Sequence, residues 1–190
     1  QNVVSNSAYE GKEIEDWEVI DLLTRLADKS LIVPGEAFGE HRYKMLETVR
    51  QYSREMLESN SETEVVSERH LGFFTDYAEL CEDKIQGPDQ AEWLDRLEVD
   101  HDNVRTAIQW SLQTVSGVQL GYRLTGAIGR FWSVRGYFNE GRALMDRVLT
   151  AHPGVISIER ATACRTAGQI AYWQGDSVAG RSYGEESLSI

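Results

Sequence analysis

Three consecutive residues near the middle of the chain could carry acid–base chemistry or bind a metal. His101 stands beside Asp102 and Asn103, and a histidine next to a carboxylate can act as a general base or as a metal ligand. The other histidines are scattered, and no second histidine or cysteine stands at the spacing of a metal site. Asp and Asn are also typical of turns and helix N-caps. We therefore predict that Asp102 or Asn103 caps a helix.

The two cysteines do not indicate a reactive site. Cys81 and Cys164 are 83 positions apart, which is neither a zinc spacing nor a disulfide framework, and this usage fits a reducing cytoplasm. Cys81 could pair with a histidine as a nucleophile. It falls on an apolar helical stripe with Phe74 and Tyr77, however, so we expect it to be buried. Because no set of nucleophile, base and orienting group is visible, the sequence predicts that the chain is not an enzyme.

Charge is unevenly distributed along the chain, whose formal net charge is −12. Residues 61–103 hold 13 acidic and three basic residues, whereas residues 104–190 hold six acidic and nine basic residues, all of them Arg. DNA binding requires clustered Lys and Arg, so the whole chain is a poor match for nucleic acid. The acidic stretch is expected to be a solvated face, and a docking surface for a basic partner is the alternative.

The spacing of the apolar residues predicts a mainly α-helical protein with one β-hairpin. Residues 13–29 carry apolar side chains at helical spacing. The period then changes from 3.6 to 2 around Pro34 and Gly35, which predicts a β-hairpin over residues 31–46. No apolar run reaches the ~18 residues of a membrane span, so we expect no membrane contact. A helix resumes at Glu47.

A long helix and a second interrupted helical stretch are predicted to follow. Ser61 and Glu64 match a capping box that would begin the long helix, which Gly87 would end. A further apolar stripe begins at Trp93 and is interrupted by four polar residues at positions 100–103. We expect a turn there, and one unbroken helix is the alternative.

A repeat with a period of 39 residues occupies the C-terminal part of the chain. Its small residues would let paired helices approach closely, with a glycine at the turn between them. The repeated residues are Gly129, Trp132, Gly136, Gly141 and Leu149, which recur as Gly168, Ala171, Gly175, Gly180 and Leu188. The pattern resembles the tetratricopeptide repeat (TPR), although the period exceeds the usual ~34 residues. We expect antiparallel helical hairpins, in an array that continues past Ile190.

Four aromatic residues of these repeats could stack on nucleic-acid bases. At their helical offsets we expect them in the core of the repeats instead. They are Phe131, Trp132, Tyr172 and Trp173.

A second resemblance covers almost the whole chain. Five segments carry it in order: LLTRLADKSL at 22–31, RYKMLETVRQY at 42–52, WLDRL at 93–97, HDNVR at 101–105 and FWSVRG at 131–136. They resemble bacterial STAND-type regulatory ATPases, among them transcriptional regulators of the LuxR-like and antibiotic-regulator (SARP) kinds. The resemblance implies a partial winged helix with a β-hairpin over residues 1–60, a helical linker over 61–116 and TPR-like repeats over 117–190.

In that family an NB-ARC-like nucleotide-binding module precedes the winged helix. This chain has no Gly-x4-Gly-Lys-Ser/Thr phosphate loop, so we expect no cofactor here and ATP or ADP only in a module before Gln1. Where relatives can have a Met-His-Asp motif that contacts nucleotide, this chain has Met45, Leu46 and Glu47. Leu46 cannot donate a hydrogen bond to phosphate. We expect Met45 and Leu46 to pack the hairpin on the core and Glu47 to favour a helix N-terminus.

The TPR resemblance also implies a binding groove, because the first helix of each hairpin lines it. Aligning Gly129 with Gly168 places Arg123 and Arg130 on this face in one hairpin, and Arg165, Gln169 and Tyr172 in the next. Converging guanidinium groups can bind carboxylate or phosphate in bidentate fashion. We predict that the groove docks an acidic peptide or an anionic ligand. The alternative is solvation, or surface ion pairs with Glu140, Asp146 and Glu159.

Two functions follow from these features. The first is a non-catalytic regulatory module in the cytoplasm, which senses a protein or peptide through the repeats and restrains a neighbouring ATPase module, for example that of its own parent chain. The alternative is a DNA-binding winged helix of a transcription factor. Residues 13–29 hold six acidic residues against Arg25 and Lys29, which would repel phosphate. We therefore favour the first function and expect no nucleic-acid binding.

Overall fold

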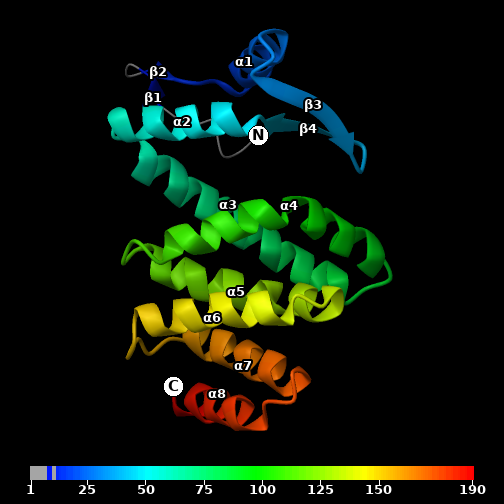
Figure 1. The fold of residues 1–190 in the computed structure, drawn as a ribbon, viewed down its shortest axis with the longest axis vertical. Helices are drawn as coiled ribbons and strands as arrows, with labels where there is room; N and C mark the ends of the chain where they lie inside the picture. Colours follow the sequence, from blue (N-terminus) through cyan, green and yellow to red (C-terminus); the bar gives the residue numbers. More distant parts are fainter. Residues whose placement is uncertain (1–7, 10–11) are drawn as a thin grey trace. The chain divides into compact units, whose positions relative to one another are not determined.

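The computed structural model describes residues 8–9 and 12–190, and the chain divides into two compact units, Gln1–Arg69 and His70–Ile190. Each unit is described by itself (Figure 1). The protein is mainly α-helical with a β-hairpin near the start, as predicted. Among the described helices, none is both long enough and apolar enough to cross a membrane.

Within its described residues, the first unit contains four short strands and two complete helices. They are β1 (Ala8–Tyr9), β2 (Lys12–Glu13), α1 (Asp16–Asp28), β3 (Ile32–Ala37), β4 (Glu40–Met45) and α2 (Glu47–Ser59). Strands β3 and β4 pair antiparallel from Ile32 opposite Met45 to Ala37 opposite Glu40, which confirms the predicted hairpin. Phe38 and Gly39 connect them with φ angles of +56° and +72°, the left-handed values that a tight two-residue hairpin turn requires.

The predicted capping box at Ser61 is wrong, because Ser61 follows Asn60, the C-cap residue of α2, and does not begin the next helix. Its φ is +58°. Its N–H donates to the carbonyl of Glu58, and the N–H of Glu62 donates to the carbonyl of Leu57. This pair of hydrogen bonds is a Schellman motif, which satisfies the last carbonyls of a helix. The next helix, α3, begins two residues later at Thr63.

The second unit is a series of antiparallel helices. Helix α3 (Thr63–Ile85) begins in the first unit and continues into the second, and it is followed by α4 (Gln90–Ser111), α5 (Gly117–Arg135), α6 (Phe138–Ala151), α7 (Ile158–Trp173) and α8 (Ser177–Ser189). Figure 1 shows α4 to α8 layered one after another. One apolar core runs from α3 to α7, and its largest fully buried side chains include Trp132, Tyr122 and Phe131.

The 39-residue repeat corresponds to two helical hairpins, α5–α6 and α7–α8. Gly136 and Gly175 lie at their turns, both with φ of +81°, which a residue with a Cβ adopts only with strain. A Cβ on Gly141 would lie 2.7 Å from Trp132, and one on Gly168 would lie 3.2 Å from the carbonyl of Gly180. The small residues therefore let the paired helices approach closely, as predicted.

The predicted turn at residues 100–103 is wrong, and the alternative of one unbroken helix is confirmed. Helix α4 passes through this stretch, with Asp100 and His101 buried. These polar groups have partners within the fold. Asn103 donates to Asp100 over 3.1 Å, and His101 accepts a hydrogen bond from Trp132. Buried polar groups that are hydrogen-bonded cost little free energy. The helix can therefore continue through this polar stretch.

Candidate functional site

The nine arginines of the second unit's C-terminal part fall into two groups. Five form ion pairs with carboxylates: Arg105, Arg123, Arg135, Arg142 and Arg160. The other four are exposed, and no described residue forms an ion pair with them within 4.0 Å: Arg130, Arg147, Arg165 and Arg181. The second group consists of the better candidates for binding an external anion, because their guanidinium groups hold no carboxylate.

Arg123 belongs to the paired group, in contrast to its predicted neighbours. Its Nε and Nη2 donate to the two carboxylate oxygens of Glu79 over 2.8 and 2.7 Å, and Nη2 also contacts Asp76 at 3.2 Å. These hydrogen bonds raise the pKa of Arg123 and connect α5 to α3. The sequence left open that the arginines form ion pairs with Glu140, Asp146 and Glu159. Arg123 does form ion pairs, but its partners are the acidic residues of α3. The three predicted acids are hydrogen-bonded to other residues.

Arg130, Arg165 and Gln169 line one hollow of about 680 Å³. Arg130 comes from α5, and Arg165 and Gln169 stand one helical turn apart on α7. Side chains of α3 and α6 complete the wall. The remaining lining residues are Glu82, Gln86, Gly126, Gly129, Ser133, Val134, Phe138, Thr166 and Trp173. The Thr166 hydroxyl donates to the carbonyl of Thr162 over 3.0 Å within α7, and it lies 3.4 Å from the carbonyl of Gly126 on α5.

Tyr172 lines a neighbouring hollow of about 520 Å³ between α7 and α8, together with Arg165, Gln169 and Trp173. The prediction that the repeat aromatics form core is confirmed for Phe131 and Trp132 and wrong for the other two. Tyr172 is 70% and Trp173 68% exposed. The 39-residue period explains the exposure of these two side chains. Position 171 corresponds to the buried Trp132, so Tyr172 and Trp173 correspond to Ser133 and Val134, which are not in the core.

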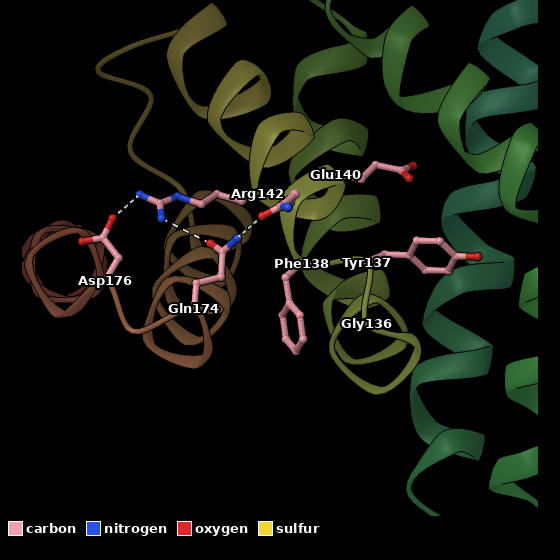
Figure 2. Close-up of a pocket in the computed structure, with 8 residues that line it drawn as sticks. Gly136, Tyr137, Phe138, Glu140, Arg142, Gln174 and Asp176 are labelled. Carbon is pink, nitrogen blue, oxygen red and sulfur yellow. Dashed lines mark hydrogen bonds and ion pairs between the residues drawn. The ribbon is translucent and has the colours of Figure 1, made fainter.

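A third hollow, of about 560 Å³, lies beside the two hairpin turns (Figure 2). Figure 2 shows Arg142 of α6 reaching Asp176 and Gln174, with Nη2 donating to Asp176 over 2.8 Å and Nη1 to Gln174 over 3.2 Å. Gln174 in turn donates to Asn139 over 2.7 Å. The polar groups here bind one another, so this network joins α6 to the following hairpin and leaves little for a ligand.

The His101 motif has a structural role that differs from both sequence-based interpretations. The Nε2 of His101 accepts a hydrogen bond from the Nε1 of Trp132 over 3.1 Å. The ring packs against Phe131 and Tyr137, and burial lowers its pKa. Asp102 does not cap a helix, since it lies inside α4 and pairs with Arg105 at 2.6 Å. Across residues 8–9 and 12–190, no three His, Cys, Asp or Glu side chains form a metal-binding group.

The residues at the nucleotide-sensor-like position lie at the junction of β4 and α2. Met45 ends β4, and its Sδ accepts a hydrogen bond from Ser53 over 3.5 Å. Leu46 is the N-cap residue of α2 and is 48% exposed, so the expectation that it packs on the core is wrong. Glu47 lies in the first turn of α2, as predicted, and pairs with Arg50 at 3.3 Å.

Cys81 is buried, as predicted, and so is Cys164. Burial raises the pKa of both thiols to about 11, so neither is a nucleophilic thiolate at neutral pH. Several residues that line the Arg130 hollow were not predicted from the sequence, among them Glu82 and Trp173. Trp173 could have been placed from the repeat alone, because it is equivalent to Val134 on the same face as Arg130.

The chain is similar to curated proteins that carry the name "Putative HTH-type transcriptional regulator". Three of them, from Mycobacterium bovis AF2122/97 and from the CDC 1551 and H37Rv strains of Mycobacterium tuberculosis, are each 31% identical over 139 residues. The chain resembles part of a regulator. The alignment covers 73% of this chain but only 15% of each relative's length. No protein-family profile and no solved structure matches the chain.

Proposed function

We propose that this chain is a non-catalytic part of a transcriptional regulator, in which the second unit is an interaction module. The names of the three relatives support the link to transcription. In the finer form of the proposal, the parent protein is a cytoplasmic STAND-type regulator, ATP or ADP binds in a module outside this chain, and the repeats sense a protein or peptide.

One observation in particular supports the proposal that the second unit is an interaction module. The hairpins α5–α6 and α7–α8 repeat the same turn geometry and present Arg130 and Arg165 in one open hollow without an ion-pair partner among the described residues. Repeats of this kind stack side by side and create extended surfaces that bind partners. The buried thiols and the hydrogen-bonded His101 are unsuited to catalysis, which supports a non-catalytic role.

The experiment measures transcription in the whole regulator after the repeat packing is disrupted. Gly129→Val places a side chain where a Cβ would already lie 2.0 Å from Thr166, so the contact of α5 with α7 must shift. We expect the response of a target-gene reporter to be lost or to become constitutive, while the protein level measured by immunoblot changes less than twofold. An unchanged response with α7 demonstrably displaced would contradict the proposal.

The second candidate function is DNA binding by the first unit, and the relatives' helix-turn-helix names favour it. The β4 strand carries His41, Arg42 and Lys44, which could contact phosphate. Helix α1 carries acidic residues, including Asp21 and Asp28, which would repel it. Fluorescence anisotropy with a labelled duplex at 50 and 200 mM salt distinguishes the two, since phosphate binding weakens steeply with salt. We expect no binding at either concentration.

A further inference from the structure

We propose that the hollow lined by Arg130 and Arg165 docks an acidic peptide segment that also carries an apolar side chain. The proposal rests on the function proposed above, since it takes the repeats as an interaction module and names the chemistry of the partner. Three features of the hollow support it: its charge, its exposed apolar side chains and its continuation across α7 into the neighbouring hollow.

Arg130 and Arg165 differ from most other arginines of the unit in that no described carboxylate forms an ion pair with them. Six arginines of the same unit already contact carboxylates, several of them with two hydrogen bonds, as Arg123 does with Glu79. Arg130 and Arg165 share a hollow in which no described carboxylate is hydrogen-bonded to either of them. The acidic group on its wall is Glu82, which Arg165 attracts electrostatically without forming an ion pair. Guanidinium groups favour planar, bidentate carboxylate recognition. A carboxylate from a partner could therefore form with Arg130 and Arg165 the kind of ion pair that the other arginines form within the unit.

The rim of the hollow carries exposed apolar side chains. Trp173 is 68% exposed and Val134 is 50% exposed, and both line the hollow with the half-buried Phe138. Exposed aromatic side chains beside arginine are typical of residues that contribute most to binding at protein interfaces. An occupant with only carboxylates would leave this surface in water, so the partner should present an apolar side chain close to its acidic ones.

The shape of the site favours a chain segment over a small anion. Arg165, Gln169 and Trp173 line this hollow and also the hollow between α7 and α8. They follow one another at a spacing of four residues, so they form a single stripe along α7. A segment lying across this stripe would contact both hollows, whereas a small anion would fill a fraction of the volume of about 680 Å³.

A nucleic acid is a poorer match for the same surface. Glu82 of α3 is part of the wall of the hollow, and α3 carries further acidic residues close by in sequence, among them Glu79 and Asp83. A polyanion with a phosphate at every nucleotide would meet these carboxylates. A peptide can place one or two carboxylates at the arginines and a neutral side chain opposite Glu82.

The test uses the 190-residue chain and an array of 12-residue peptides. Each peptide contains two Glu at a varied spacing and one Leu in a Ser and Gln background. A fluorescein-labelled copy of the strongest binder is then titrated in solution. Arg130→Glu with Arg165→Glu is compared with Arg147→Glu and Arg181→Glu, a matched control because Arg147 and Arg181 are also exposed but do not line the hollow. Circular dichroism checks that both double variants fold.

We expect the Arg130 and Arg165 variant to weaken peptide binding at least ~tenfold, since reversing charges at an interface is costly. The control variant should change it less than twofold, and Trp173→Ala should weaken it severalfold. The proposal is overturned if no array peptide binds, if both double variants lose affinity equally, or if inorganic phosphate or single-stranded DNA competes as well as the peptide. If one of these results is found while Gly129→Val still alters the response of the target-gene reporter, only the peptide proposal is overturned and the proposed function stands.

Discussion

The indole Nε1 of Trp132 donates a hydrogen bond to the Nε2 of His101, 3.1 Å away, and both side chains are buried. The acceptor nitrogen must carry no proton, so the proton of the neutral imidazole is on Nδ1. The bond joins α4 to α5, the first helix of the repeated hairpins. The residue that most resembles a catalytic base in the sequence is therefore a hydrogen-bond acceptor within the core.

Stability should depend on the protonation of His101. Burial lowers the pKa of His101 in the folded protein below its ordinary value of 6.5, so the unfolded chain binds the proton more readily. The free energy of unfolding should therefore fall as the pH drops below about 6.5. Urea unfolding at pH 7.5 and 5.5 measures this loss.

The variant His101→Leu tests this effect, and it also removes the contact of His101 Nε2 with Glu140 Oε1 at 3.4 Å. It leaves the indole N–H of Trp132 without an acceptor, so we expect it to lower stability by ~1–3 kcal/mol at pH 7.5. The loss on going to pH 5.5 should be smaller than in the parent. An equal pH dependence in the parent and in His101→Leu would contradict the prediction.

Gly141 should not tolerate a side chain. A Cβ there would lie 2.7 Å from the ring of Trp132, and overpacking of this kind costs ~1–3 kcal/mol. We expect Gly141→Ala to destabilise the protein by that amount in urea unfolding. Gly184→Ala in α8 is the matched control, because no atom lies within 4 Å of its added Cβ and alanine favours a helix over glycine by ~0.5–1 kcal/mol. The two changes should have opposite signs.

Arg142 should anchor the α7–α8 hairpin, since it binds both Asp176 and Gln174 near the turn. We expect Arg142→Ala to increase hydrogen exchange in the first turns of α8 by about fivefold, in line with the ~1 kcal/mol that a partly exposed ion pair contributes. Arg181 stands 39 residues later in the repeat and has no ion-pair partner among the described residues. Exchange that rises equally in Arg181→Ala would show that the network is not the cause.

The two thiols should react slowly in the folded protein. Both are buried with a pKa of about 11, so little thiolate is present at pH 8. We expect a thiol reagent such as dithionitrobenzoate to label Cys81 and Cys164 at least ~100-fold more slowly in buffer than in 6 M guanidinium chloride. Rapid labelling of either thiol in the native protein would argue against its burial.

Local patterns were sufficient to predict most of the secondary structure and the repeat. The change of period at Pro34 and Gly35 predicted the β3–β4 hairpin, and Gly136 and Gly175 predicted the turns of the two helical hairpins. These features depend on neighbours along the chain and on which residues can adopt a positive φ. For that reason the sequence alone was enough to find them.

The roles of single polar and aromatic residues depended on groups that are distant in sequence. His101 is bonded to a residue 31 positions away and Arg123 to one 44 positions away, so neither a capping role nor a free guanidinium could be tested from local spacing. Arg130 and Arg165 were predicted from the sequence as binding residues, but only the packing of α3, α5, α6 and α7 places them in one hollow. The same packing brings Arg123 within hydrogen-bond distance of Glu79. Ion pairs and hydrogen bonds join whichever groups the fold brings within about 3 Å, and that proximity is a property of the tertiary structure.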